Sequence, residues 1–161
     1  MIGLRDADNG ARATYAFIMR LAAIDVGSNS VHMVIADVRR DGHFEVIDRV
    51  KEMVRLGRNT FTSGRLAREP MELAVRALKN FARLAKVRRV DRIRAVATSA
   101  VREAQNGEAF IARIRRETGL RVQIISGAEE AQFIFNAARH ALGLEGGPYL
   151  LIGRASCRER V

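Results

Sequence analysis

Apolar residues follow two different periods along the chain, and this predicts a domain that mixes strands and helices. Apolar runs at residues 21–26 and 31–38 flank a Gly-Ser-Asn-Ser turn, the pattern of two strands joined by a tight turn. Asp41-Gly42 supplies a second turn before a third alternating segment at residues 44–56. Three consecutive antiparallel strands are therefore expected, followed by one long loop at residues 55–64.

The second half of the chain alternates between helical and strand periods. Glu69-Pro70 opens a helix with one apolar face, and Gly119 ends a second helix. Strands are expected at residues 93–97 and 122–125, and a last strand starts at Tyr149. Ser126 and Glu129 have the spacing of a capping box, which opens a third helix.

The resulting order is β-β-β-α-β-α-β-α-β. Because helical crossovers join the later strands, these are expected to be parallel. The order predicts an α/β fold with a mixed, ribonuclease-H-like sheet, truncated in its last strand.

The two ends of the chain differ from the segment between them. Residues 1–18 lack a clear pattern, and Met19 immediately precedes the first apolar run, so a start at Met19 and an ordinary tail are alternatives. Residues 152–161 resemble the translation of a common sequencing adapter in one reading frame. We therefore expect an N-terminal extension over 1–20, one folded lobe over 21–151 and a processing scar over 152–161.

Composition restricts the partners. The chain has 28 Lys and Arg against 18 Asp and Glu, a formal charge of +10. Arginine binds phosphate through paired hydrogen bonds, so polyanions are candidate partners, although many Arg-rich surfaces are only solvated. No apolar run approaches the roughly 18 residues of a membrane span, so a cytoplasmic location without a membrane partner is expected. The single Cys157 excludes an internal disulfide.

The most informative segment surrounds the first turn. Asp25 lies in an otherwise apolar strand, where a carboxylate costs desolvation energy unless it is paired or binds a metal. We expect it to face a bound magnesium ion or the water of that ion. Gly27 lets the backbone approach a ligand, and the amides and hydroxyls of Ser28, Asn29 and Ser30 would surround phosphate oxygens. The alternative is a plain hairpin turn.

Two later strand ends carry further polar residues. Thr98 and Ser99 follow the strand at 93–97 and would donate to phosphate, while Arg102, one turn into a helix, would neutralise its charge. The alternative is an ordinary helix cap with a surface arginine. If Glu129 completes the capping box, Glu130 is free to orient an attacking water, because adjacent helical residues point about 100° apart. The alternative is that both glutamates only interact favourably with the positive end of the helix dipole.

These three segments, in this order and spacing, resemble the exopolyphosphatase and guanosine pentaphosphate phosphatase family of the actin-like ATPase superfamily. The resemblance covers residues 21 to about 151 and is most specific at 23–33, Ala-Ile-Asp-Val-Gly-Ser-Asn-Ser-Val-His-Met, and at 124–131, Ile-Ile-Ser-Gly-Ala-Glu-Glu-Ala. It implies an N-terminal lobe in which residues 25–30 form the first phosphate loop, Arg102 binds phosphate and Glu130 is the base. The second phosphate loop of the family has no counterpart after Tyr149.

The resemblance implies a magnesium-dependent hydrolase that releases terminal orthophosphate from polyphosphate or guanosine pentaphosphate, a homodimer at full length and inactive as this fragment. It does not choose between the two substrates. Two alternatives stay open: a kinase of the same superfamily, and a non-catalytic lobe that binds polyphosphate or nucleic acid, although nucleic acid is not the expected partner. His32, on the second strand, is expected to be structural.

Overall fold

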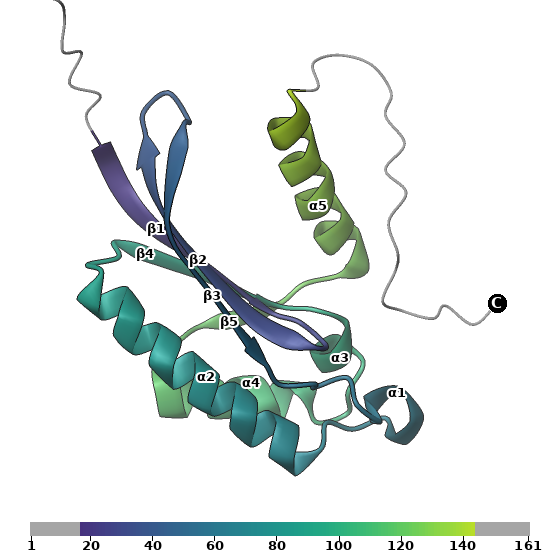
Figure 1. Ribbon diagram of the computed structural model, residues 1–161. Helices are drawn as coiled ribbons and strands as arrows, with labels where there is room; N and C mark the ends of the chain where they lie inside the picture. Colours follow the sequence, from purple (N-terminus) through teal and green to yellow (C-terminus); the bar gives the residue numbers. More distant parts are fainter. Residues whose placement is uncertain (1–16, 144–161) are drawn as a thin grey trace, which may run out of the picture.

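Three antiparallel strands open the part of the chain that the computed structural model describes, residues 17–143 (Figure 1). They are β1 (Phe17–Val26), β2 (Ser30–Arg39) and β3 (Phe44–Met53). β1 begins before the predicted apolar run and includes Met19. Both turns lie where the sequence predicts them, because Gly-Ser-Asn-Ser and Asp41-Gly42 interrupt the apolar alternation.

The later strands alternate with helices, as the sequence predicts. α2 (Arg68–Val87) leads to β4 (Arg92–Ala97), α4 (Gly107–Thr118) leads to β5 (Val122–Ile124), and α5 (Gly127–Leu142) follows. The sheet order is β3-β2-β1-β4-β5, with β4 parallel to both β1 and β5. This is the predicted mixed, ribonuclease-H-like sheet, and it places the carboxyl ends of β1, β4 and β5 at one edge.

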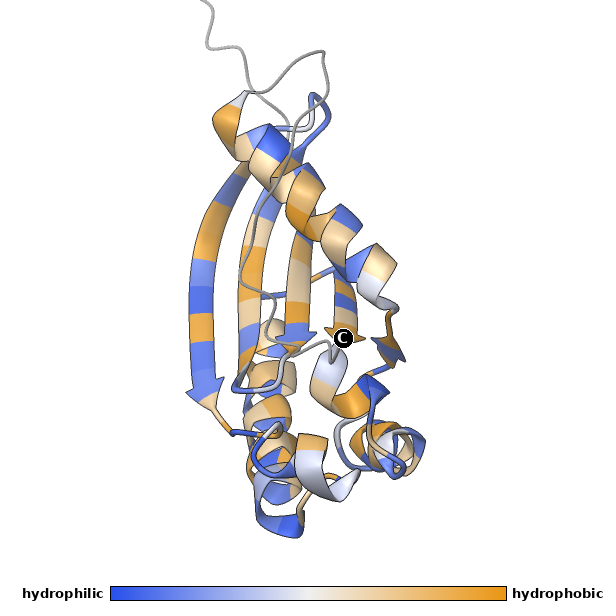
Figure 2. Cartoon of the chain, turned by 90° about the vertical axis from the view of Figure 1, so that its right-hand side faces the viewer, coloured by the Kyte–Doolittle hydropathy of each residue, from blue (hydrophilic) through white to orange (hydrophobic). Residues whose placement is uncertain are grey.

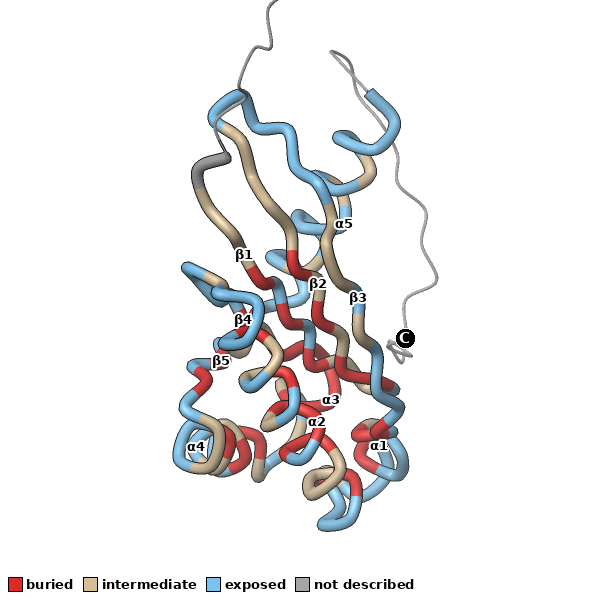
Figure 3. The backbone as a smooth tube through the Cα atoms, turned by 60° about the vertical axis from the view of Figure 1, so that its left-hand side comes forward, coloured by how far each residue is buried: buried red, intermediate tan, exposed pale blue. Residues whose placement is uncertain are grey.

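The core lies on one face of this sheet, which α2 and α4 cover (Figure 1). β1 turns Ala22, Ile24 and Val26 toward these helices, and each is at most 2% exposed. Phe81 of α2 and Phe110 of α4 meet them and are equally buried. Figure 3 shows the buried residues gathered there, whereas α5 and the hairpin between β2 and β3 are largely exposed.

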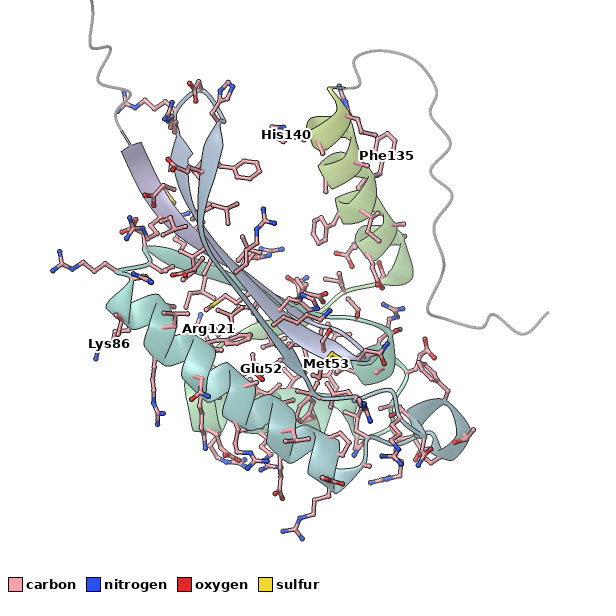
Figure 4. All side chains as sticks on the ribbon, in the orientation of Figure 1. Glu52, Met53, Lys86, Arg121, Phe135 and His140 are labelled. Carbon is pink, nitrogen blue, oxygen red and sulfur yellow. The ribbon has the colours of Figure 1, made fainter. Side chains whose placement is uncertain are left out.

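The opposite face of the sheet is open. Ala23 and Asp25, which alternate with the core residues of β1, are exposed. α5 crosses this side of the strands (Figure 2) but has no buried residue. At its far end His140 points toward the hairpin, with Phe135 on the other side of the helix (Figure 4), and the His140 and Phe44 rings stack with centroids 5.4 Å apart. The space beside Asp25 is thus accessible to a ligand.

Two local predictions require correction. Residues 55–64 are not one loop, because they contain α1 (Thr60–Ser63), which starts after Asn59 in a left-handed conformation with φ 63°. β4 is followed by two helices rather than one, because the short α3 (Ser99–Arg102), in which Arg102 lies one turn in as predicted, precedes α4. α3 and α4 approach closely at Gly107, where a Cβ would lie 2.1 Å from the Val101 carbonyl oxygen.

Several predictions fall on residues outside 17–143: most of the N-terminal extension, the strand from Tyr149, Cys157 and the segment 152–161. Within 17–143, none of the helices combines the length and the apolar character that crossing a membrane requires.

Candidate phosphate-binding site

The parallel strands bring the three sequence segments together. Val26 pairs with Ala97 and Ala97 pairs with Ile124, so the residues that follow β1, β4 and β5 leave the sheet side by side. The Thr98 amide donates to the Val26 carbonyl (3.3 Å), and the Ile125 amide donates to the Ala97 carbonyl (3.1 Å). Strand ends of this kind are where open α/β sheets bind ligands.

The turn after β1 is held by the segment that follows β3. The Asn29 carbonyl accepts hydrogen bonds from the Val54 and Arg55 amides (3.0 and 2.8 Å), and the Ser28 carbonyl accepts one from the Gly57 amide (2.7 Å). These bonds turn the carbonyls away from the site. The amides of Ser28 and Asn29 donate to no acceptor within the described residues, and such neighbouring free amides are suited to an anion.

Three hydroxyl groups of the site, those of Ser28, Ser30 and Ser99, are bonded to other side chains. Ser28 Oγ lies 2.8 Å from Ser99 Oγ, which joins the turn to the start of α3. Ser30 Oγ lies 2.6 Å from His32 Nε2. Thr98, Ser99 and Ser30 are at most 8% exposed. These hydroxyls are therefore already engaged or buried, whereas the amides of Ser28 and Asn29 are not bonded within the described residues.

Arg102 and Glu130 lie together although they are far apart in the sequence. Arg102 Nη1 donates to the Ile125 carbonyl (2.9 Å) and to Glu130 Oε2 (3.2 Å). Both side chains are partly exposed, by 25% and 29%. The carbonyl bond fixes the guanidinium beside the strand ends. Glu130 Oε1 has no hydrogen-bond partner among residues 17–143, so it is available to a water molecule.

Glu129 and Glu130 contact different partners, as the sequence predicts. Glu129 completes the capping box of α5: its carboxylate accepts from the Ser126 amide (2.8 Å), and its own amide donates to Ser126 Oγ (3.1 Å). The bond from the Ser126 amide, followed by that from the Ser126 hydroxyl, lowers the pKa of Glu129. Glu130 points instead toward Arg102.

Asp25 is an exposed carboxylate that makes neither a hydrogen bond nor an ion pair with any described residue. Partial desolvation raises the pKa of Asp25, the neighbouring Glu130 raises it further, and His32 opposes this effect. No group of three or more His, Cys, Asp or Glu side chains suited to a metal occurs within residues 17–143. Magnesium, however, is often held by one or two carboxylates together with phosphate oxygens and water, and this arrangement fits that mode.

Two supports of the site are not among the residues that the sequence assigns to ligand binding: the sequence predicts a loop at 55–64 and a structural role for His32. One is the segment from Val54 to Gly57, whose amides anchor the turn. The other is His32, which contacts Ser30 and pairs with Asp25 across β1 and β2. The strand alternation contains a signal for His32, because it places that side chain on the open face with Asp25. No comparable period marks the Val54–Gly57 contacts.

Comparisons with known proteins agree with the fold and the segments. The profile of the Ppx/GppA phosphatase family matches residues 34–154. Exopolyphosphatase 1 of Mycobacterium leprae is 36% identical over 129 residues, which are 80% of this chain and 38% of that protein. Exopolyphosphatase 2 of Mycobacterium tuberculosis is 35% identical over 143 residues, 84% of this chain and 45% of that protein.

Solved structures of exopolyphosphatases and Ppx/GppA family members also match this fold. The crystal structure of the Aquifex aeolicus Ppx/GppA family member matches with a TM-score of 0.74 and 37% identity, over 80% of this chain and 42% of that one. An exopolyphosphatase from Cytophaga hutchinsonii matches with a TM-score of 0.72 and 34% identity, over 75% and 38%. This chain spans less than half the length of each of these relatives. Its fold is that of the actin-like N-terminal lobe, and the chain belongs to the Ppx/GppA phosphatase family.

Proposed function

We propose that this chain is the phosphate-binding lobe of a magnesium-dependent hydrolase that releases terminal orthophosphate from polyphosphate or guanosine pentaphosphate. The observation that carries the proposal is the convergence of Asp25, the turn at 27–30, Arg102 and Glu130 at one edge of the sheet. Relatives named exopolyphosphatases support the substrate class.

The terminal phosphate binds first to the turn. Its oxygens accept hydrogen bonds from the free amides of Ser28 and Asn29, and the Arg102 guanidinium offsets their charge. Arg102 keeps its bond to the Ile125 carbonyl and turns a free N–H toward the phosphate. Asp25 would hold magnesium together with phosphate oxygens, and the ion would supply further charge neutralisation.

Glu130 then acts as the base toward the attacking water. Its Oε1 accepts a hydrogen bond from the water and takes a proton as the water oxygen bonds to the terminal phosphorus. The phosphoanhydride bond on the opposite side breaks, so orthophosphate and a chain shortened by one phosphate leave. The ion pair between Glu130 and Arg102 fixes the carboxylate for this step.

The test uses two proteins. One is the 161-residue chain, and the other is a chimera in which residues 21–151 replace the matching segment of the Mycobacterium leprae exopolyphosphatase. Phosphate release from long-chain polyphosphate and from guanosine pentaphosphate is measured with magnesium. Release by the chimera supports the proposal, and the preferred compound identifies the substrate.

Glu130→Gln separates hydrolysis from binding. Loss of a general base lowers turnover by about 10²–10⁴-fold while leaving polyphosphate affinity nearly unchanged. Glu103→Gln, an acid at the end of α3, is the matched control and keeps turnover. If the folded chimera binds polyphosphate but releases no phosphate, the chain is a binding lobe and the hydrolase proposal is wrong.

A further inference from the structure

His32 is the one histidine on the open face beside the phosphate turn. Its ring nitrogen Nε2 lies 2.6 Å from Ser30 Oγ, and its residue pairs directly with Asp25 across β1 and β2. Directly paired residues project to the same face of a sheet, so His32 and Asp25 share the face opposite the core. His32 Nδ1 makes no hydrogen bond with any described residue.

The short contact between His32 and Ser30 has two possible directions with opposite consequences. A serine hydroxyl has one hydrogen and two acceptor lone pairs. If Ser30 donates that hydrogen to Nε2, it presents only lone pairs to the turn, and these repel phosphate oxygens. If His32 donates from Nε2–H, the Ser30 hydrogen is free to bind a phosphate oxygen. The direction of this bond thus decides whether Ser30 attracts or repels an anion.

We propose that His32 is a positioning residue, which donates from Nε2–H to Ser30 and so directs the Ser30 hydroxyl hydrogen at the phosphate bound in the turn. The proposal rests on the phosphate-binding role of that turn. A chain of bonds from His32 through Ser30 to phosphate has all its donors aligned, and aligned bonds strengthen one another. Phosphate binding therefore selects the Nε2–H tautomer.

The charged neighbours of His32 come from the strands on either side. They are Asp25 on β1 and Lys51, its direct partner on β3. Glu130 lies beyond Asp25 and acts on it electrostatically. The tautomer is therefore compared with and without triphosphate at one fixed pH of about 8.

A double-mutant cycle in the 161-residue chain tests the proposal, with inorganic triphosphate and magnesium as the probe. Ser30→Ala and His32→Leu are each expected to weaken binding about threefold to tenfold, the value of one hydrogen bond. The double variant should bind as Ser30→Ala does, within about twofold, because His32 acts only through Ser30. His32→Gln, whose amide supplies an N–H near the Nε2 position, should restore binding, and His43→Leu on the exposed hairpin is the matched control.

Nitrogen-15 NMR of the unsubstituted chain gives a second readout that needs no variant. Triphosphate should shift the His32 ring toward the form with hydrogen on Nε2. Additive losses in the cycle, failure of His32→Gln to restore binding, or a bound form with unprotonated Nε2 would each overturn the proposal while leaving the phosphate site intact. No triphosphate binding by the unsubstituted chain would overturn this inference, whereas the proposed function is overturned separately, by a folded chimera that releases no phosphate.

Discussion

At the scale of single residues, Asp25 shows a conflict between stability and ligand binding. The folded structure raises the pKa of Asp25, so the folded state favours the protonated carboxyl. The stabilisation of the fold by this proton is complete below the ordinary pKa of aspartate. It is lost as pH rises through the pKa of Asp25 in the folded state. Asp25→Asn replaces the carboxylate by an amide that does not ionise, so the stability lost at neutral pH is regained. We expect its melting temperature at neutral pH, without divalent cations, to rise by no more than about 4 °C, while magnesium-dependent triphosphate binding is lost.

Calorimetry and binding titrations check the Asp25 prediction together. Asp91→Asn, far from the site on the loop before β4, is a poor control because Asp91 accepts from the Arg20 amide. Glu52→Gln, on the core-facing side of β3, is the better one and should keep binding. A less stable Asp25→Asn at neutral pH would mean that Asp25 stabilises the fold and is not held there for a ligand.

A second prediction at this scale concerns the close contacts of Gly57. A Cβ at this position would lie 3.0 Å from Ser28 Cβ and 3.3 Å from Phe61 Cε2. Gly57→Ala must therefore displace Ser28, and we expect a stability loss of about 1–3 kcal/mol in urea titrations together with weaker triphosphate binding. Gly127→Ala, whose Cβ would meet only Arg102 at 3.9 Å, should fold as the unsubstituted chain does. Equal stability of the two variants would contradict this tight support of the turn.

Whether the sequence alone predicts a contact depends on how far apart along the chain its two residues lie. The capping box of Ser126 and Glu129 is local, so its spacing alone predicts both its bonds and the separate direction of Glu130. The contact between Arg102 and Glu130 joins different helices, and only the parallel register of β4 and β5 places them together. No periodicity within either segment contains that information.

At the scale of elements, α2 and α4 are joined by a polar bridge at the edge of their apolar contact. Glu117 accepts hydrogen bonds from Arg113 (2.7 Å) within α4 and from Lys79 (2.9 Å) of α2. The bond from Arg113, followed by that from Lys79, lowers the pKa of Glu117 to about 2. A carboxylate with a lowered pKa stabilises the fold above its ordinary pKa and ceases to do so as pH falls through the folded value.

We therefore expect Glu117→Gln to lower the melting temperature at pH 7, and the difference from the unsubstituted chain to shrink as pH falls from 4.5 to about 2. Thermal unfolding followed by circular dichroism across this pH range measures the difference. Glu108→Gln, an acid in the first turn of the same helix, is the control, because Glu108 has no ion pair among the described residues. A difference that does not vary with pH would mean that the bridge acts through packing alone.

The sequence predicts a helix where the helical period of its apolar residues extends over enough turns. α2 repeats its apolar face over 20 residues, so its pattern is unambiguous. α1 and α3 each have four residues, too few to show a helical period. Their positions depend instead on tertiary contacts, such as the bond between Ser28 and Ser99 at the start of α3.

At the scale of the whole molecule, the two faces of the sheet differ in how completely they are covered. The core face is closed by α2 and α4, whereas α5 exposes Phe133 (46%), Ile134 (54%) and Leu142 (69%). Phe133 and Ile134 are adjacent in the sequence, and contiguous exposed apolar groups are typical of surfaces that bind other protein surfaces. The relatives that match over this lobe are more than twice as long as the matched part, so in them further chain is available to cover such a surface.

The last prediction follows from this exposure. Because α5 buries no residue, replacing Phe133 and Ile134 by Gln should leave the melting temperature within about 2 °C, since exposed substitutions cost at most about 0.5 kcal/mol. The same change should reduce self-association of the chain in sedimentation experiments. Phe81→Ala, at a position that is 1% exposed, should instead cost about 3–5 kcal/mol. A loss of that size in the Phe133 and Ile134 variant would show that α5 packs against the open face in solution and covers the site.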